Sequence, residues 1–432
     1  MDQILSTTDD YSMTDQLNCD VAPGHIDRCQ ICGSNDLQQI IDLGYSAPCD
    51  SLLTKAQLME MERTYPLNLV RCRECDLVQI DYAVDPRHLF HSEYPYRSGI
   101  TETLRRNLHG TSRRVAEKTK LERGSLVVDI GSNDGTILEG FRDIGMKVLG
   151  VEPTNIADIA NGKGIETIKT FFDRKVAADI RRSHGAAALA TAANVFAHVN
   201  NLSGLLHGVH DLLRDGGVFV TESHYMLSIL ETLQYDSIYH EHLRFYLIKP
   251  LIRLFDDHGF TLIDVEQIPN YGGSIRVYAR KGRGAERSRE IDRLIAVERS
   301  RGAYEDRTYS DFANNVRVSR RKLRSLLVQL NDAGKKTVGI GCPGRAVTLL
   351  TYCGLTLDLL PYIAEQSSSL KLGLYTPGTH IPVVDEAVMF EEQPEYGLIL
   401  SWHYADPIVA SLRKKGLKSK VIVPLPEIRI LE

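Results

Sequence analysis

Residues 126–141, LVVDIGSNDGTILEGF, predict an apolar strand that ends in a glycine-containing turn and leads into a helix. Gly131 and Gly135 allow the backbone of this turn to approach a ligand, because glycine has no side chain. The next apolar stretch, residues 147–151, is followed by Glu152. A carboxylate at a strand end can accept hydrogen bonds from both hydroxyls of a ribose. This unit therefore predicts an α/β fold with a ligand site at the ends of its strands.

The same alternation of strands and helices continues along the chain. Further strands, the last two as a hairpin that closes the sheet, are expected within residues 186–199, 216–225, 259–268 and 272–282. This order predicts a parallel, doubly wound sheet in a domain at residues 91–283. Residues 284–332 are charged and predict connecting helices. Residues 335–350 begin a second strand–turn–helix series, which predicts a Rossmann-like C-terminal α/β domain at residues 284–432.

Bulk properties indicate a cytoplasmic protein of several domains. The chain has 432 residues, of which 43% are hydrophobic and 25% charged, as in ordinary globular proteins. The net charge of -5 and the pI near 6.3 provide no basic surface for nucleic acid. No apolar run approaches the roughly 18 residues that a membrane span needs. Residues 1–25 are polar and predict a flexible tail without the features of a signal peptide. We expect no nucleic-acid or membrane partner, and a monomer.

Four of the eight cysteines form two CxxC pairs, which predict a tetrahedral zinc site. Cys29 and Cys32 form the first pair, and Cys72 and Cys75 form the second. Each pair places two thiolates on one turn, at the reach that Zn²⁺ requires. Four thiolates leave no open coordination position, so this zinc would be structural. We assign it to a module at residues 26–90, with redox-active thiols as the alternative.

A second glycine loop, GIGCPG at residues 339–344, matches G-x-G-x-x-G after a strand, and Glu365 follows at the next strand end. Pro343 removes a backbone N–H from the loop that would have to donate to a phosphate. This substitution argues against a redox dinucleotide. Two interpretations stay open: Gly341 and its neighbours bind the nucleotide or phosphate part of a substrate, or the loop is a purely structural turn.

Polar side chains follow two neighbouring strands of the predicted sheet. His198 comes shortly after the strand that ends at Asn194, and Glu222 and His224 follow the next strand. Residues 239–242, Tyr-His-Glu-His, come soon after. Ligands of open α/β sheets bind beyond the carboxyl ends of the strands, so these side chains are expected to face one cleft.

The residue types in this cleft suit acid–base chemistry. Imidazole titrates near neutrality, so His242 or His198 can take a proton at physiological pH. Glu241 can orient an imidazole, and Tyr239 can donate to a developing oxyanion. His240 suits a structural role. Metal ligation is the alternative for the cluster, although the HExxH spacing is absent.

The first glycine turn and its acidic strand end resemble the first two motifs of class I S-adenosylmethionine (AdoMet) methyltransferases. AdoMet has no pyrophosphate, so the full phosphate-binding glycine set is not needed. The alternative is a plain strand–turn–helix. The resemblance implies AdoMet as the cofactor and a set of cofactor-binding residues: Asp129, Gly131, Ser132, Asn133, Asp134, Gly135, Glu152 and Asn194.

From about residue 26 to its end, the chain resembles the sugar C-methyltransferases that act on nucleotide-linked 4-keto-6-deoxyhexoses. The resemblance rests on the order of several motifs: CxxC…CxxC, EYPYRSG, VVDIGSNDGT, IYHEHLRFY, GIGCPGRAVTLL, YTPGTHIPV and LSWHYAD. It implies that His242 is the catalytic base, with Tyr239, Glu241 and His198 beside it. It also implies that the substrate contacts Tyr94, Tyr96, Ser98, Glu222, His224, Gly341, Lys371 and His380, of which the Lys371 and His380 positions also suit surface loops.

The implied reaction removes the C3 proton of a 4-keto sugar and methylates the resulting enolate carbon in deoxysugar biosynthesis. Cys342, Pro343 and Arg345 depart from the family pattern, which leaves the identity of the nucleotide open. An O- or N-methyltransferase on another small polar metabolite is one alternative. A zinc-dependent binding protein without activity is another, although the complete first glycine turn argues against it.

Overall fold

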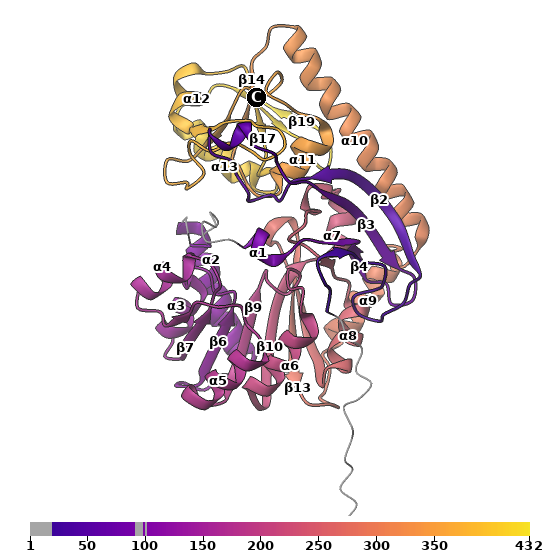
Figure 1. Ribbon diagram of the computed structural model, residues 1–432, viewed down its shortest axis with the longest axis vertical. Coiled ribbons are helices and arrows are strands. Elements are labelled where there is room, and N and C mark those ends of the chain that lie inside the picture. The colour runs from indigo at the N-terminus through magenta and orange to yellow at the C-terminus, as the bar shows by residue number, and fades with distance from the viewer. Residues whose placement is uncertain (1–19, 91–97, 100–101) are drawn as a thin grey trace, which may run out of the picture.

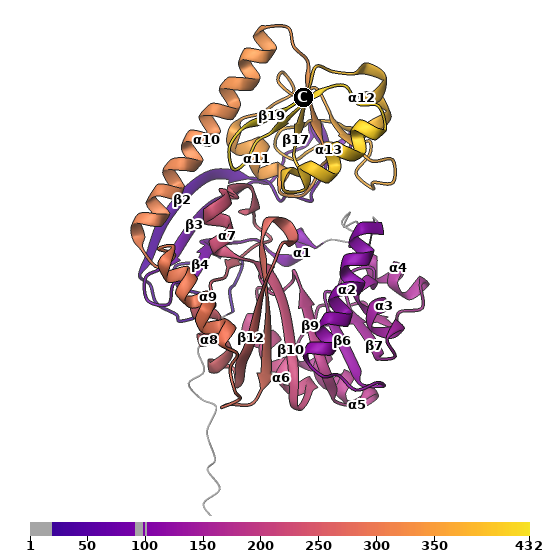
Figure 2. The same ribbon diagram turned by 180° about the vertical axis from the view of Figure 1, so that it is seen from behind.

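The computed structural model of the protein describes residues 20–90, 98–99 and 102–432 (Figure 1). An N-terminal module, a central domain and a C-terminal domain follow one another along the chain. The C-terminal domain lies over one end of the central sheet, and the view from behind shows the same arrangement (Figure 2). Within the described part of the chain, no helix combines the length and the apolar character that a membrane span requires.

The central domain contains a seven-stranded sheet in the order β12-β13-β10-β9-β6-β7-β8. The strands are Leu126–Ile130 (β6), Lys147–Val151 (β7), Thr167–Ile168 (β8), Ala187–Ala193 (β9), Leu213–His224 (β10), Phe260–Ile268 (β12) and Ser274–Lys281 (β13). Strands β6 to β10 are parallel, and β12 and β13 form an antiparallel hairpin that pairs with β10. The predicted doubly wound sheet and its closing hairpin are confirmed.

Helices cover both faces of this sheet. They are Glu102–Lys118 (α2), Thr136–Asp143 (α3), Ile156–Gly162 (α4), Arg174–His184 (α5), Leu202–Leu212 (α6) and Ile248–Asp257 (α8). Helix α7, Met226–Thr232, instead follows the end of β10 and contacts α10 (Asp306–Asp332). Successive residues of β6 point to opposite faces, so Val127 packs in one apolar cluster with Leu138 and Val128 packs in another with Leu205. Both faces of the sheet are buried under apolar side chains, which explains why the sequences of the parallel strands are continuous apolar runs.

The N-terminal module is built on a four-stranded antiparallel sheet in the order β11-β4-β3-β2. Its elements are Gly24–His25 (β1), Leu37–Ser46 (β2), Gln57–Met59 (η1), Tyr65–Cys72 (β3), Val78–Ile80 (β4), Tyr82–Ala83 (β5) and Pro86–Leu89 (α1). The strand β11, Arg244–Phe245, comes from the central domain, directly after the Tyr-His-Glu-His segment. The module is therefore completed by a segment that sequence reasoning assigned elsewhere.

Residues 20–25 do not behave as the tail that the sequence suggested. The backbone N–H of Val21 donates to the carbonyl of Asn200 at 2.9 Å, and β1 pairs with β5. The chain in this region is anchored to both the central domain and the module. Polar composition alone did not reveal this, because the anchoring bonds come from the backbone.

The C-terminal domain has six strands in the order β16-β15-β14-β17-β18-β19, parallel except for the last pair. The strands are Thr337–Ile340 (β14), Ile363–Glu365 (β15), Val383–Asp385 (β16), Tyr396–Ile399 (β17), Lys420–Val423 (β18) and Arg429–Leu431 (β19). The helices are Arg289–Ser300 (α9), Asp306–Asp332 (α10), Ala346–Cys353 (α11), Glu386–Glu392 (α12) and Ala405–Lys414 (α13). Short 3-10 helices occur in the central domain at Tyr235–Ser237 (η2) and Asn270–Gly272 (η3), and in the C-terminal domain at Trp402–Tyr404 (η4). The predicted second α/β domain is confirmed.

The predicted connecting helices are α9 and α10. The long helix α10 runs along the side of the molecule next to β2 (Figure 1). Helix α9 packs beside α8 and β12 of the central domain, and Ser288 N at its start donates to Ile263 O at 2.8 Å. The boundary that we placed at residue 284 thus separates α9 from the domain against which it packs.

Candidate active site

The four paired cysteines form one buried cluster in the N-terminal module. The potential ligand atoms of Cys29, Cys32, Cys72 and Cys75 all lie within 4.8 Å of one another. Sγ of Cys29 is 3.4 Å from Sγ of Cys75, and Sγ of Cys32 is 3.5 Å from Sγ of Cys72. Zn–S bonds of about 2.3 Å in a tetrahedron place sulfur atoms about 3.8 Å apart. The two CxxC turns therefore fit one closed zinc site.

The first glycine turn lies at the carboxyl end of β6. Gly131 and Gly135 have φ angles of +68° and +76°, which disfavour any residue with a side chain. A Cβ at Gly131 would also collide with Cγ2 of Val195. Among the described residues, Ser132 Oγ and Asn194 Oδ1 are buried without a hydrogen-bond partner. The turn is thus shaped by glycine, and it and the loop after β9 each contain a buried polar atom without a partner.

Glu152 follows β7 and braces this turn. Its Oε2 accepts from the backbone N–H of Asn133 at 3.0 Å, and its Oε1 accepts from Thr154 N at 2.9 Å and Thr154 Oγ1 at 2.7 Å. These bonds fix the plane of the carboxylate at the strand end. Both lone-pair sites of Oε1 are used, and Oε2 keeps acceptor capacity for a further hydroxyl.

Residues 98 and 99 lie against the same turn. Ser98 N donates to Asn133 Oδ1 at 2.8 Å, and Gly99 N donates to Asp134 Oδ2 at 3.2 Å. Asp134 is fully buried and also accepts from Thr136 Oγ1 at 2.7 Å. Its carboxylate therefore connects the turn to the EYPYRSG segment. Two residues of that segment, Tyr94 and Tyr96, lie outside the described residues.

Asp129 is the last acidic residue of β6 and is buried. Its Oδ1 accepts from Thr191 Oγ1 at 2.6 Å. Burial raises the pKa of Asp129 to about 7, and the neighbouring carboxylates of Glu152 and Glu222 add to the shift. A buried carboxyl group surrounded by other carboxylates fits a cationic ligand, which would favour its ionised form.

Three imidazoles converge beyond the ends of β9 and β10. The ring centroid of His242 lies 4.8 Å from that of His198, 4.6 Å from that of His224 and 4.0 Å from that of Tyr239. These side chains come from the loop after β9, from the end of β10 and from the segment after η2. The structure thus brings together the residues that the sequence placed in one cleft.

The hydrogen bonding of His242 determines its tautomer. Its Nδ1 lies 2.7 Å from the carbonyl oxygen of Ser237, so Nδ1 carries the proton and donates it to that carbonyl. Burial, with His224 and His198 nearby, lowers the pKa of His242 well below its usual value. The ring is therefore neutral at physiological pH, with Nε2 as its acceptor atom.

Glu241 faces His198 rather than His242. Its Oε2 lies 3.9 Å from Nδ1 of His198, and its Oε1 accepts from the thiol of Cys49 at 3.3 Å. Burial lowers the pKa of His198 to about 4 and raises that of Cys49 well above its ordinary value. Cys49 therefore stays a neutral thiol that can donate to Glu241. Sequence reasoning missed Cys49, since an unpaired cysteine carried no signal.

Glu222 and His224 lie at the end of β10 with different surroundings. The carboxylate of Glu222 is buried and accepts from Nε of Arg276 at 2.6 Å. His224 stacks near His242 and Tyr271, and burial lowers its pKa to about 3. His224 thus faces the cluster, whereas Glu222 belongs to an ion pair within the sheet.

His240 does not join the cluster. Its Nε2 lies 3.1 Å from the carbonyl of Pro66 in β3. This position agrees with the structural role expected for it. Among the described residues, the groups whose ligand atoms converge as for a metal are the four cysteines and a set of Cys49, Asp50 and Glu241. The metal interpretation of the histidines therefore has no support in the described part of the chain.

The Lys371 side chain is not exposed, so its expected place in a surface loop is wrong. Its Nζ donates to Asp50 Oδ1 at 2.8 Å and to Cys342 O at 3.0 Å, with 9% of the side chain exposed. The ammonium group ties the N-terminal module to the second glycine loop. The partner Asp50 is distant in sequence, so no local pattern announced the pair.

The second glycine loop is held from within its own domain. Gly341 has a φ of +76°, and the backbone N–H of Cys342 donates to Glu365 Oε2 at 2.7 Å. Glu365 lies at the end of β15, as predicted. His380 does not contact this loop in the described hydrogen bonds. Its Nε2 lies 3.0 Å from Oε2 of Glu62 in the N-terminal module.

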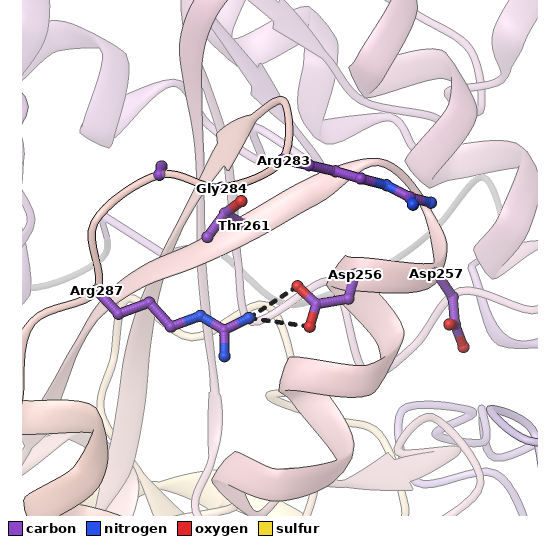
Figure 3. Close-up of a pocket in the computed structure, with 7 residues that line it drawn as sticks. Asp256, Asp257, Thr261, Arg283, Gly284 and Arg287 are labelled. Carbon is purple, nitrogen blue, oxygen red and sulfur yellow. Dashed lines mark hydrogen bonds and ion pairs between the residues drawn. The ribbon is translucent and has the colours of Figure 1, made fainter. Parts of the chain in front are cut away.

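A pocket lies at the end of the central sheet opposite the histidine cluster, and Figure 3 shows the residues that line it. Its lining residues are Asp256, Asp257, Thr261, Arg283, Gly284, Ala285 and Arg287. Nη2 of Arg287 donates to both carboxylate oxygens of Asp256 at 2.9 Å. Residues 283–287 of the pocket follow β13. Near its end, β13 pairs with the first half of β10 through Arg280 and Val218, which places the pocket at the amino ends of the parallel strands. Ligands of open α/β sheets bind at the other edge, so we assign no function to this pocket.

The fold and the strand-end site define a class I methyltransferase that uses AdoMet and carries a zinc-binding module. Three domain models match the chain: a zinc binding domain at residues 29–90, a methyltransferase domain at residues 96–265 and a C-methyltransferase C-terminal domain at residues 269–426. C-methyltransferase NovU from Streptomyces niveus is 33% identical over 410 residues, which are 94% of this chain and 97% of that protein. The chain therefore belongs to the C-methyltransferase family that includes NovU.

Solved structures resemble part of the chain. A chain of the complex between the Haloferax volcanii Trm112 methyltransferase activator and a methyltransferase covers 43% of this chain and 99% of its own, at 13% identity and a TM-score of 0.34. Magnesium protoporphyrin IX methyltransferase from Synechocystis PCC 6803 covers 41% of this chain and 83% of its own, at 13% identity and a TM-score of 0.32. Both similarities are weak, and the family assignment rests on the domain models and on NovU.

AdoMet affinity should depend on pH through Asp129. The raised pKa near 7 means that the free protein holds a proton that a cationic ligand would displace. Affinity should therefore rise by up to about tenfold per pH unit as the pH increases toward 7, and then level off. Calorimetry at pH 5.5, 6.5 and 7.5 would measure it. Asp129→Asn should bind more weakly and lose this dependence, and an unchanged pH dependence in this variant would contradict the assignment.

Proposed function

We propose that this protein methylates C3 of a nucleotide-linked 4-keto-6-deoxyhexose, with His242 as the base. The observation that carries the proposal is the neutral imidazole of His242, whose Nδ1–H is held by the Ser237 carbonyl at 2.7 Å. This bond occupies Nδ1 and leaves Nε2, on the other side of the ring, as the atom that can accept a proton. Carbon methylation needs such a base, because a carbon atom must lose a proton before it can act as a nucleophile.

The side chains around His242 suit the charge that develops in this reaction. When Nε2 takes the C3 proton, the electrons of the C–H bond pass into an enolate whose charge lies largely on the C4 oxygen. Burial raises the pKa of Tyr239 well above its ordinary value, so its phenol keeps a proton to donate to that oxygen. Bound AdoMet would supply an electrophilic methyl group on a sulfonium. The C–C bond would form at the enolate carbon while the S–CH₃ bond breaks and its electron pair stays on the sulfur of the leaving thioether.

The cofactor side of the cleft is built from the β6 and β7 ends. We propose that Glu152 and the backbone of residues 131–135 bind the cofactor, with Ser132 and Asn194 as further contacts. Three features support this: the glycine geometry, the braced carboxylate and the unsatisfied polar atoms. Asp129 would lie near the positive charge of the cofactor. Holding both reactants in register supplies a large part of the rate in such two-substrate reactions.

We propose that the C-terminal domain binds the nucleotide part of the substrate. Gly341 offers a left-handed backbone turn at the end of β14, the edge at which α/β sheets bind ligands. The described polar partners of Lys371 and His380 are within the protein, which makes them supports of this region more than primary contacts. The nucleotide base stays open.

The test is to incubate the protein with a 4-keto-6-deoxy nucleotide sugar in D₂O, with and without AdoMet. Mass spectrometry and proton NMR would follow the sugar. We expect deuterium uptake at C3 without AdoMet, and with AdoMet a one-methyl mass gain and no proton at C3. Methylation with the C3 proton retained would instead support O- or N-methyl transfer. No exchange and no methylation with several nucleotides would contradict the proposal.

A further inference from the structure

Arg345 reaches from the C-terminal domain into the central domain. It follows the second glycine loop, directly before α11, and only 7% of its side chain is exposed. Its Nε donates to Asp236 Oδ2 at 2.8 Å and its Nη2 donates to Asp236 Oδ1 at 2.9 Å. This two-point contact fixes the orientation of both groups, as is usual for a bidentate arginine–carboxylate pair.

The remaining donors of the guanidinium are also used. Nη2 donates to Gln234 Oε1 at 3.0 Å and to the hydroxyl of Ser237. Nη1 lies 3.3 Å from the Tyr271 carbonyl oxygen and 3.3 Å from Nδ1 of His403. Every nitrogen of Arg345 therefore has a partner, and most partners belong to the segment that precedes the Tyr-His-Glu-His residues.

Two further bonds from the C-terminal domain hold the same segment. Trp402 Nε1 donates to Asp236 Oδ2 at 2.7 Å, and Thr348 Oγ1 in α11 donates to the Ile238 carbonyl at 2.9 Å. The C-terminal domain thus fixes the η2 segment at two points, the carboxylate of Asp236 and the backbone carbonyl of Ile238. Ser237 lies between these points, and its carbonyl accepts the Nδ1 proton of His242.

We propose that Arg345 is a positioning residue for His242, which it orients through Asp236 and Ser237. The inference rests on the proposed function, in which His242 Nε2 is the base. These contacts of Arg345 connect the second glycine loop, which we assign to the substrate nucleotide, to the ring of His242, whose Nε2 would remove the proton. Arg345 is one of the residues that differ from the family pattern, and the sequence alone indicated no role for it.

A role in domain cohesion alone would explain the contacts less well. A buried ion pair recovers little net stability, because both charges lose their water. Several apolar side chains would join two domains at lower cost. A guanidinium whose nitrogens all have oxygen or nitrogen partners instead specifies one geometry, which a proton-transferring imidazole requires.

The experiment compares Arg345→Gln, Arg345→Lys and Asp236→Asn with the parent protein. The matched control is Arg413→Gln, since Arg413 also belongs to the C-terminal domain and donates to the Leu417 carbonyl of that domain at 2.7 Å. The readouts are the ¹⁵N NMR signals of the His242 ring, assigned with His242→Asn, the AdoMet dissociation constant, and kcat and KM for the 4-keto sugar.

In Arg345→Gln we expect kcat to fall by about 30- to 100-fold, since a displacement of about 1 Å at a catalytic group costs on the order of 10²-fold. AdoMet affinity should change less than about threefold, because Arg345 contacts none of the cofactor turn. The His242 ring should lose its single Nδ1–H tautomer. Arg345→Lys should recover part of kcat, because lysine keeps the charge without the two-point contact. Arg413→Gln should match the parent.

An unchanged His242 tautomer and an unchanged kcat, in folded Arg345→Gln or Asp236→Asn, would overturn the inference and leave only domain cohesion. The NMR readout needs no substrate. If the parent protein fails to exchange the C3 proton of any 4-keto sugar, the proposed function fails, while the tautomer comparison still tests the positioning by Arg345.

Discussion

His242→Asn should reduce methyl transfer by about 10³- to 10⁴-fold, which is the upper part of the range that general base catalysis supplies. Asparagine can keep the hydrogen bond to the Ser237 carbonyl, whose acceptor atom lies 2.7 Å from the imidazole nitrogen. It has no atom that takes a proton near neutral pH. The variant should therefore fold and bind AdoMet, yet show neither methylation nor deuterium uptake at C3. Mass spectrometry of the sugar in D₂O measures both losses.

The neighbouring histidine provides the control for this prediction. His240 is as buried as His242, but its Nε2 lies 3.1 Å from the Pro66 carbonyl and faces away from the cluster. His240→Asn should retain methylation per folded molecule, although its melting temperature should fall. Loss of C3 exchange in His240→Asn with retention in His242→Asn would exchange their assignments. Loss of AdoMet binding in His242→Asn would show that this residue serves the cofactor instead.

Removal of the zinc ligands should cause the second large effect. Cys72→Ser should abolish zinc binding and unfold the N-terminal module, because structural zinc contributes about 10–16 kcal/mol to folding in small metal-binding domains. Metal analysis should find one zinc per parent chain and none in the variant.

This loss should extend to activity. The module supplies Cys49, which donates to Glu241 at 3.3 Å, and Asp50, which pairs with Lys371 at 2.8 Å. A disordered module would release both contacts. Cys353→Ser is the control for zinc content, because Cys353 is a buried thiol outside the zinc cluster. Full zinc content and full activity in Cys72→Ser would contradict a zinc site of four cysteines, as would a disulfide between the CxxC cysteines.

The glycine turn, the CxxC pairs and the individual strands were predictable because they are local patterns. Gly131 and Gly135 mark left-handed turn positions, and each CxxC pair places two thiolates on one turn. Apolar runs such as Leu126–Ile130 identify strands with both faces buried. For these features, neighbours in sequence are neighbours in space.

The tail limits and the polar partners were less predictable. Residues 20–25 are polar, yet their backbone pairs with the module and the central domain. Glu241 is adjacent to His242 in sequence, but its carboxylate lies near His198. Composition and adjacency do not report which way a backbone or side chain turns once it is packed.

The sequence by itself therefore determined the class of this protein: an α/β methyltransferase of the C-methyltransferase family with a four-cysteine zinc site and a second α/β domain. Only the tertiary structure decided how the proposed base is held. Arg345 meets Asp236 and Cys49 meets Glu241 across long stretches of chain. A buried polar group must find a partner wherever the fold brings one, and that choice follows from the packing of three domains rather than from any local pattern.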